Sequence, residues 1–129
     1  MSTDLLLDTH ALLWIIADDP RLEPLLGDAL DDDAATVSVS TISYLEITIK
    51  QSIGKLDVDV SKVRRHVRTA GLLELDVIGS HAEALAQLPL HHRDPFDRTL
   101  IAQALAEDMA IATADSEFLD YEGLRIHGR

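Results

Sequence analysis

Residues 5–16 read LLLDTHALLWII, and this stretch decides the fold class. Its three leucines form a short, uniformly apolar run, which is typical of a strand buried on both faces of a parallel sheet. The run ends at Asp8, and the apolar residues from Ala11 to Ile16 continue the chain as a helix. A buried strand that leads directly into a helix predicts an α/β fold, with helices covering both faces of the sheet.

Strands and helices alternate along the rest of the chain. Further strands are expected at 36–40, 72–77, 109–114 and 124–126, and helices at 22–31, 41–53, 61–70, 80–88 and 95–108. The clearest helix start is Asp94-Pro95, because aspartate caps the first turn and proline needs no N–H at the first helical position. Gly54 and Gly71 are expected to end the helices that precede them. The pattern predicts a mostly parallel central sheet of four to five strands, flanked by helices.

Composition narrows the class of protein. With 129 residues and 47% apolar composition, the chain can fill one core but not two, so we expect a single domain over residues 1–129. The sequence contains no cysteine, which excludes disulfides, thiolate nucleophiles and cysteine-based zinc sites. The N-terminal region carries neither a signal-like segment nor an apolar run long enough to span a bilayer. We therefore expect a cytoplasmic protein with no membrane partner.

The formal charge of −12 argues at first against a nucleic-acid partner, because phosphate binding favours a basic surface. The charge is unevenly distributed, however. Residues 1–33 hold nine acids against Arg21 alone, whereas residues 50–68 hold six lysines and arginines against two acids. Such basic runs are usually solvated helix faces, but their presence leaves an anionic partner open.

Two aspartates directly follow predicted strands at opposite ends of the sequence. Asp8 comes after the strand at 5–7, and Asp115 comes after the strand at 109–114. Each aspartate could simply cap the helix or turn that follows it. Open parallel sheets bind ligands at the carboxyl ends of their strands, however, so two acids at equivalent strand ends favour a functional site.

A glutamate in the helix at 41–53 adds a third acid. Glu46 falls inside a row at helical spacing, so we expect its carboxylate to point toward the core; the row is Ile42, Leu45, Ile49 and Ile53. Burying an unpaired carboxylate costs several kcal/mol, so Glu46 needs a partner, a raised pKa or a metal ion. Lys50, four residues later, is the ordinary alternative partner, although a lysine at that offset usually lies on a solvated face.

Asp97 is the fourth acid, in the first turn of the helix at 95–108. It shares a face with apolar residues of that helix, namely Leu100, Ile101, Ala104 and Leu105. The helix dipole favours a negative charge in this turn, which offers a structural explanation for both Asp94 and Asp97. We assign Asp94 to capping and Asp97, which is turned toward the core, to the site.

Four carboxylates in one cleft repel one another, and a divalent cation would relieve that repulsion. Ligands that are all oxygens, without cysteine, favour Mg²⁺ or Mn²⁺ over zinc. Such a site is suited to phosphodiester hydrolysis, in which the metal activates water and no protein nucleophile is required. The sequence lacks a nucleophile elbow, a P-loop and a dinucleotide fingerprint, which weakens the cases for acyl transfer, nucleotide hydrolysis and dinucleotide binding.

Four motifs together resemble the PIN-domain family, and more closely the VapC-type ribonuclease toxins of bacterial type II toxin–antitoxin systems. They are Asp8-Thr9-His10-Ala11-Leu12-Leu13-Trp14, Glu46-Ile47-Thr48-Ile49-Lys50, His92-Arg93-Asp94-Pro95-Phe96-Asp97-Arg98 and Thr113-Ala114-Asp115. The resemblance covers nearly the whole chain. It implies a PIN-like three-layer sandwich and a Mg²⁺-dependent endoribonuclease, in which Mn²⁺ can substitute for Mg²⁺.

The resemblance also implies residue roles and partners. Asp8 and Asp97 would be the principal metal ligands, and Glu46 and Asp115 would complete the site directly or through water. Lesser candidates for contacts to RNA or phosphate are Thr113, Ser116 and Arg98. The expected partners are an RNA substrate, a second copy in a homodimer, and a cognate VapB-type antitoxin whose tail brings a basic side chain into the acidic cleft.

Other interpretations stay open at the level of the sequence. Arg98 could pair with Asp94 instead of RNA, and the histidines at 10, 91 and 92 could touch phosphate, although their spacing does not demand it. A receiver-like domain would need adjacent acids after the first strand and a lysine after the fifth, and no lysine follows Lys62. A third possibility keeps the fold and the metal but not the catalysis, leaving a metal- or RNA-binding module that acts through protein partners.

Overall fold

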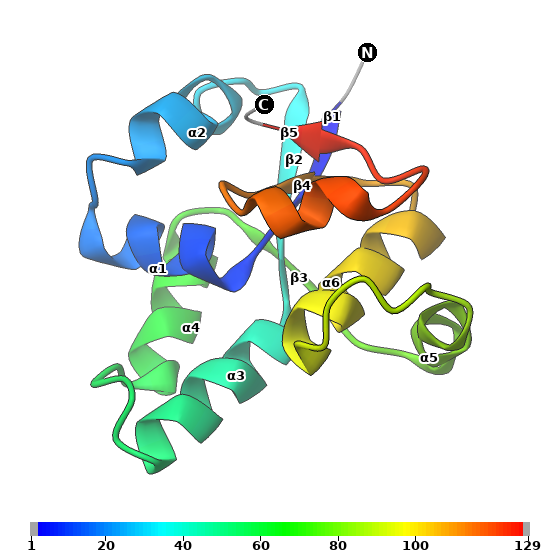
Figure 1. The fold of residues 1–129 in the computed structure, drawn as a ribbon. Coiled ribbons are helices and arrows are strands. Elements are labelled where there is room, and N and C mark those ends of the chain that lie inside the picture. Colours follow the sequence, from blue (N-terminus) through cyan, green and yellow to red (C-terminus); the bar gives the residue numbers. More distant parts are fainter. Residues whose placement is uncertain (1–2, 128–129) are drawn as a thin grey trace.

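The computed structural model describes residues 3–127, and its centre is a five-stranded sheet (Figure 1). The strands are β1 (Thr3–Leu7), β2 (Ala35–Ser40), β3 (Leu73–Leu75), β4 (Ala110–Ala112) and β5 (Ile126–His127). They lie in the order β3-β2-β1-β4-β5, and each neighbouring pair is parallel. The predicted parallel α/β sheet is confirmed.

Helices cover both faces of this sheet. They are α1 (Thr9–Ala17), α2 (Leu22–Leu30), α3 (Thr41–Ser52), α4 (Val60–Thr69), α5 (Gly79–Ala86) and α6 (Pro95–Ala106), followed by the 3₁₀ helix η1 (Ser116–Asp120). Figure 1 shows α1 and α2 on one side of the strands, and α5 and α6 on the other. None of these helices combines the length and hydropathy needed to cross a membrane.

Alternation along β1 divides the core into two layers. Leu5 and Leu7 pack with residues of α1, α2 and α4, whereas Leu6 packs with α6 and with Phe118 of η1. All three leucines are almost fully buried. Each stabilises the fold by roughly 1.5–3 kcal/mol, which explains why the buried part of this strand, residues 5–7, is entirely apolar. The result is the three-layer sandwich that the sequence predicts.

The order of the strands determines where a ligand can bind. The chain places β2 on one side of β1 and β4 on the other, so β1 and β4 flank the point where the direction of winding reverses. In open α/β sheets this switch point opens a crevice beyond the carboxyl ends of the strands. The order also differs from that of receiver domains, in which the second strand is at the edge.

The predicted helix ends are confirmed. Asp94 caps α6, since its Oδ1 accepts hydrogen bonds from the amides of Phe96 and Asp97 at 2.9 and 3.0 Å. Gly54 and Gly71, which follow α3 and α4, both have φ of +76°, a conformation that glycine adopts without a steric penalty. The strands β3 and β4 are shorter than predicted, and the 3₁₀ helix η1 follows Asp115.

One premise about α3 is wrong. The apolar row of Leu45, Ile49 and Ile53 faces outward, with exposed fractions of 55%, 46% and 61%. The buried face instead carries Ser43, Tyr44, Glu46 and Ile47. Glu46 is nevertheless buried, because each residue turns about 100° around the helix axis and brings Glu46 inward from Leu45. Periodicity identified residues that share a face, but not which face meets the core.

Candidate metal centre at the carboxyl end of the sheet

The four acids singled out in the sequence come from four separate segments. Asp8 follows β1, Glu46 lies in the second turn of α3, Asp97 in the first turn of α6, and Asp115 begins η1. Burial raises the pKa of Asp97 to about 7, and repulsion from Asp94, Glu46, Asp8 and Asp115 adds to that rise. The fold therefore brings the four carboxylates within electrostatic reach of one another.

Asp8 is held from both of its oxygens. Its Oδ1 accepts a 2.7 Å hydrogen bond from the Ala11 amide, so the predicted alternative of helix capping is real. Its Oδ2 accepts a 2.6 Å hydrogen bond from the hydroxyl of Thr113. Burial nevertheless raises the pKa of Asp8, because it outweighs these two stabilising bonds. These hydrogen bonds therefore orient the carboxylate, but they do not offset the cost of burying its negative charge.

Glu46 is buried and has two partners. The Thr9 hydroxyl donates to its Oε1 at 2.6 Å, and the Lys50 ammonium donates to its Oε2 at 2.7 Å. Lys50 is therefore the partner that the sequence offered as the ordinary alternative. The pair faces the acid cluster, because Asp94 and Asp97 also raise the pKa of Lys50, after the larger effect of its hydrogen bond to Glu46. Lys50 supplies a positive charge at the place where a metal ion is expected.

Asp115 is half-buried and also acts as a cap. Its Oδ1 accepts a 2.9 Å hydrogen bond from the Glu117 amide at the start of η1. Its own amide donates to Thr113 Oγ1 at 3.0 Å. Since the same hydroxyl donates to Asp8, Thr113 connects the two aspartates at the ends of β1 and β4.

The lesser candidates lie in different surroundings. Thr113 is fully buried, so it can act on the site only through Asp8 and Asp115. Arg98 donates to the carbonyl of Pro89 at 2.9 Å, and no ion pair with Asp94 is found among residues 3–127. Ser116 is exposed at the start of η1.

Several side chains at the site were not predicted as site residues. Thr9 bonds both to Glu46 and to Ser43, whose hydroxyl oxygen is 2.9 Å away. His92 lies beside Asp97, with its Nε2 3.8 Å from Asp97 Oδ2. The only signal for Thr9 was its hydroxyl next to Asp8, and nothing local indicates that it reaches a glutamate in another helix.

The donor set fits a hard divalent cation in its chemistry. Its candidate ligand atoms are carboxylate oxygens, and burial together with repulsion between the acids raises the pKa of Asp97. As the side chains stand, no group of three or more histidines and acids within residues 3–127 is gathered tightly enough to hold a metal ion. Glu46 forms an ion pair with Lys50, so Glu46 could bind a metal ion only if the lysine side chain moved.

A groove of about 460 Å³ adjoins the cluster on its α1–α3 side. Its lining combines Glu46 with three basic side chains and two leucines, namely Thr9, His10, Leu13, Glu46, Lys50, Lys55 and Leu56. In a chain with a net charge of −12, this basic wall beside the acids provides a local complement to an anionic ligand.

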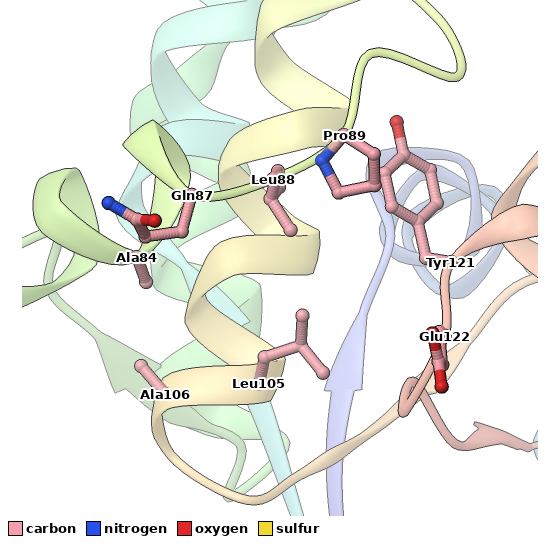
Figure 2. Close-up of a pocket in the computed structure, with 8 residues that line it drawn as sticks. All are labelled: Ala84, Gln87, Leu88, Pro89, Leu105, Ala106, Tyr121 and Glu122. Atoms are coloured by element: carbon pink, nitrogen blue, oxygen red, sulfur yellow. The ribbon is translucent and has the colours of Figure 1, made fainter.

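A second cavity of about 470 Å³ lies away from the four acids. It is mostly apolar and is shown in Figure 2, lined by Ala84, Gln87, Leu88, Pro89, Leu105, Ala106, Tyr121 and Glu122. None of the four carboxylates of the cluster lines it. Tyr121 links it to the site, since its hydroxyl lies 3.0 Å from Nδ1 of His92.

Comparisons with known proteins agree with this architecture. The family model of the PIN domain matches residues 5–124. A similar solved structure is that of VapBC2 from Rickettsia felis bound to a DNA fragment from their promoter, with a TM-score of 0.73 and 16% sequence identity. The alignment covers 97% of this chain and 98% of that one, and at this identity it demonstrates a shared fold. No curated protein sequence matches the chain significantly.

Proposed function

The chain belongs to the PIN domain family, and on this basis we propose that it is a Mg²⁺-dependent endoribonuclease, the toxin of a VapBC-type toxin–antitoxin pair. The observation that carries the proposal is the state of Asp97. Burial and the like charges around this half-buried carboxylate raise its pKa to about 7. Proteins rarely maintain such an arrangement unless the site binds a ligand that relieves it.

The metal would be held chiefly by Asp8 and Asp97, with Glu46 and Asp115 contributing directly or through water. Mg²⁺ is the expected ion, and Mn²⁺ can substitute for it. When bound, the ion supplies activation of water and neutralisation of charge on the scissile phosphate. The chain's own residues prepare the ligands: Thr113 orients Asp8, and Thr9 orients Glu46.

Lys50 would occupy two positions, one without metal and one with it. Without metal it neutralises Glu46, which explains how a buried glutamate is tolerated. With Glu46 bound to a metal ion, the Lys50 ammonium would be free to contact phosphate in the adjoining groove. Lys50 therefore links ion binding to substrate binding.

An RNA substrate is supported by the basic wall of this groove. His10, Lys50 and Lys55 all line it beside Glu46, so a phosphate backbone can approach the acids along a path of favourable potential. Arg98 and Ser116 stay candidates for further RNA contacts. Thr113, being buried, would act through the orientation of Asp8.

An antitoxin of the VapB type is proposed as the partner that inhibits the enzyme. The acid cluster is complementary to a basic side chain, and the Lys50–Glu46 pair is an example of such an interaction within this chain. The similar fold described above comes from a VapBC complex, which makes this class of partner the natural one to test. We also propose that residues 1–129 form a single domain that acts in the cytoplasm.

A homodimer is proposed through the exposed apolar row on α3. Leu45, Ile49 and Ile53 stand at four-residue intervals and form one continuous strip, unlike isolated surface leucines. In a dimer, the strips of the two copies would cover each other around a two-fold axis.

We expect Ile49→Ser to shift the protein from dimer to monomer in light scattering. Its melting temperature should stay within about 2 °C of that of wild type measured at a dilution where wild type is also monomeric.

The proposed function is tested by cleavage of total cellular RNA and tRNA by the purified protein. The reactions compare Mg²⁺ with EDTA, and wild type with Asp97→Asn. The matched control is Asp108→Asn, which makes the same change at an almost fully exposed aspartate just past α6. Asn tolerates the left-handed φ of 55° at position 108, so the control keeps its backbone.

We expect cleavage that requires Mg²⁺, persists in Asp108→Asn and falls by roughly 100-fold or more in Asp97→Asn. Equal behaviour of wild type and Asp97→Asn, with Mg²⁺ bound, would contradict the enzyme assignment. That outcome would favour a catalytically weak metal- or RNA-binding module that acts through protein partners.

A further inference from the structure

His92 approaches Asp97 from the loop before α6, and one of its ring nitrogens has no partner. Its side chain is 10% exposed, and its Nε2 lies 3.8 Å from Asp97 Oδ2. Within residues 3–127 this buried nitrogen accepts or donates no hydrogen bond. Buried polar atoms are seldom left unpaired, so the position of Nε2 requires an explanation.

Tyr121 holds the other side of the ring. Its hydroxyl is 3.0 Å from His92 Nδ1, and its ring packs edge-on against the imidazole at a centroid distance of 5.4 Å. Phe118 adds a second ring contact at 6.0 Å. Tyr121 is itself buried, in the wall of the apolar cavity near Pro89 and Leu105 (Figure 2). The imidazole of His92 is thus held in place by contacts with buried neighbours.

These contacts suggest which nitrogen carries the proton. A tyrosine hydroxyl that donates to Nδ1 leaves the proton of a neutral imidazole on Nε2. The Nε2–H then faces the carboxylate of Asp97. A movement of about 1 Å would bring the two atoms to hydrogen-bond distance, which is within the range of a side-chain adjustment when a site closes on a ligand.

We propose that Tyr121 and His92 are positioning residues for the metal centre: Tyr121 fixes the Nε2–H tautomer of His92, and His92 donates that proton to Asp97 and orients it as a ligand. Ligands of metal ions are generally oriented by such hydrogen bonds, and losing one typically weakens metal binding by roughly 10- to 100-fold. The inference rests on the proposed metal centre and adds two residues to it. Neither residue is one of the four acids.

Two substitutions at position 92 distinguish the role of Nε2 from the role of Nδ1. His92→Gln keeps a donor long enough to reach Asp97 in place of Nε2–H, but loses the acceptor for Tyr121. His92→Asn keeps a polar group near the hydroxyl of Tyr121, but nothing that reaches Asp97. His91→Asn is the matched control. His91 also packs edge-on against Tyr121, with ring centroids 4.9 Å apart, but it is exposed and has no hydrogen bond to Asp97 among the described residues.

The measurement is Mn²⁺ affinity of the full chain without RNA, from the paramagnetic resonance of free Mn²⁺. We expect a loss of about 10-fold in His92→Asn and about 3- to 10-fold in Tyr121→Phe. His92→Gln and His91→Asn should stay within about 3-fold of wild type. Unchanged affinity in a folded His92→Asn protein, or no Mn²⁺ binding by wild type, would overturn the proposal.

The tautomer gives a second measurement that does not depend on activity. ¹⁵N chemical shifts of the His92 ring should show Nε2–H in the wild type and a mixture of tautomers in Tyr121→Phe. A ring protonated at Nδ1 alone would overturn the proposal, because Nε2 would then be an acceptor. Absence of RNA cleavage by a wild type that shows both expected results would contradict the proposed function while leaving this inference standing.

Discussion

Near the carboxyl ends of β1 and β4 four acids lie within electrostatic reach of one another, whereas between α3, α4 and β3 Glu74 faces partners of complementary charge. Arg64 donates to both oxygens of Glu74, at 2.9 and 3.0 Å, and the Tyr44 hydroxyl donates at 2.6 Å. These bonds lower the pKa of Glu74 to about 2, first through Arg64 and then through Tyr44. Burial and like charges instead raise the pKa of Asp97 to about 7.

The two regions differ in how their carboxylates are neutralised. The Glu74 carboxylate is paired with Arg64 and hydrogen-bonded by Tyr44, and these contacts stabilise the fold. Around Asp97, within residues 3–127, Lys50 is the only lysine or arginine that pairs with one of the four acids, so the cluster keeps an excess of negative charge. Natural proteins accept such a local conflict mainly where function requires it.

The largest expected difference between the two regions is in activity. Asp8→Asn should reduce RNA cleavage by roughly 100-fold or more, because it removes the charge of a proposed metal ligand while asparagine keeps the helix cap. Glu74→Gln should leave the rate unchanged within about 2-fold, since it alters only the ion-pair network. Initial rates on the same RNA at saturating Mg²⁺ measure both. Equal losses in the two variants would remove the distinction between the regions.

The two carboxylates should also affect stability with opposite dependence on pH. The pKa of Asp97 rises from 3.8 to about 7 on folding, so the folded protein binds this proton more tightly. Wild-type stability therefore falls as pH rises between these values. Asp97→Asn should be more stable than wild type by on the order of 1–2 kcal/mol at about pH 8 without divalent cations, allowing for partial exposure.

This advantage should shrink as pH falls and vanish below the unfolded-state pKa of 3.8, where Asp97 is protonated in both states. Thermal melts of the two proteins across this range, in a buffer containing EDTA, make the comparison. A constant difference at all pH values would show that Asp97 does not titrate as described.

Glu74→Gln should show the reverse trend. The pKa of Glu74 falls from 4.5 to about 2 on folding, so its stabilisation is complete above 4.5 and is lost as pH falls toward 2. We expect a loss of about 1 kcal/mol at neutral pH, kept small because solvent screens this partly exposed pair. The loss should shrink in melts below about pH 4. A loss that persists at low pH would indicate packing rather than charge.

Lys50→Gln should have the smallest effect, because the glutamine amide keeps a neutral hydrogen-bond donor at position 50 and Thr9 still donates to Glu46. We expect a loss of about 0.5–1 kcal/mol without metal, for the exchange of a charged hydrogen bond for a neutral one. Added Mg²⁺ should then stabilise the variant more than the wild type, because no lysine competes for Glu46. Melting temperatures with and without Mg²⁺ measure this, and equal shifts would argue against competition.

Local patterns in the sequence were sufficient for much of this account. The apolar run of β1, the cap and proline of α6, and the glycines after α3 and α4 all act over a few residues, and the structure bears them out. The acids after β1 and β4 were identifiable because the ends of parallel strands meet at one edge. The orientation of α3 was not, since an apolar row fits either a core or a second protein surface.

The sequence by itself determined the α/β class, the ends of the helices and the presence of acids at the strand ends, because these depend on neighbours along the chain. Only the tertiary structure decided which side chains meet. Thr9 reaches Glu46 across 37 residues, His92 reaches Tyr121 across 29, and Thr113 reaches Asp8 across 105. These contacts follow from the strand order, which places β2 on one side of β1 and β4 on the other, and no local pattern encodes that order.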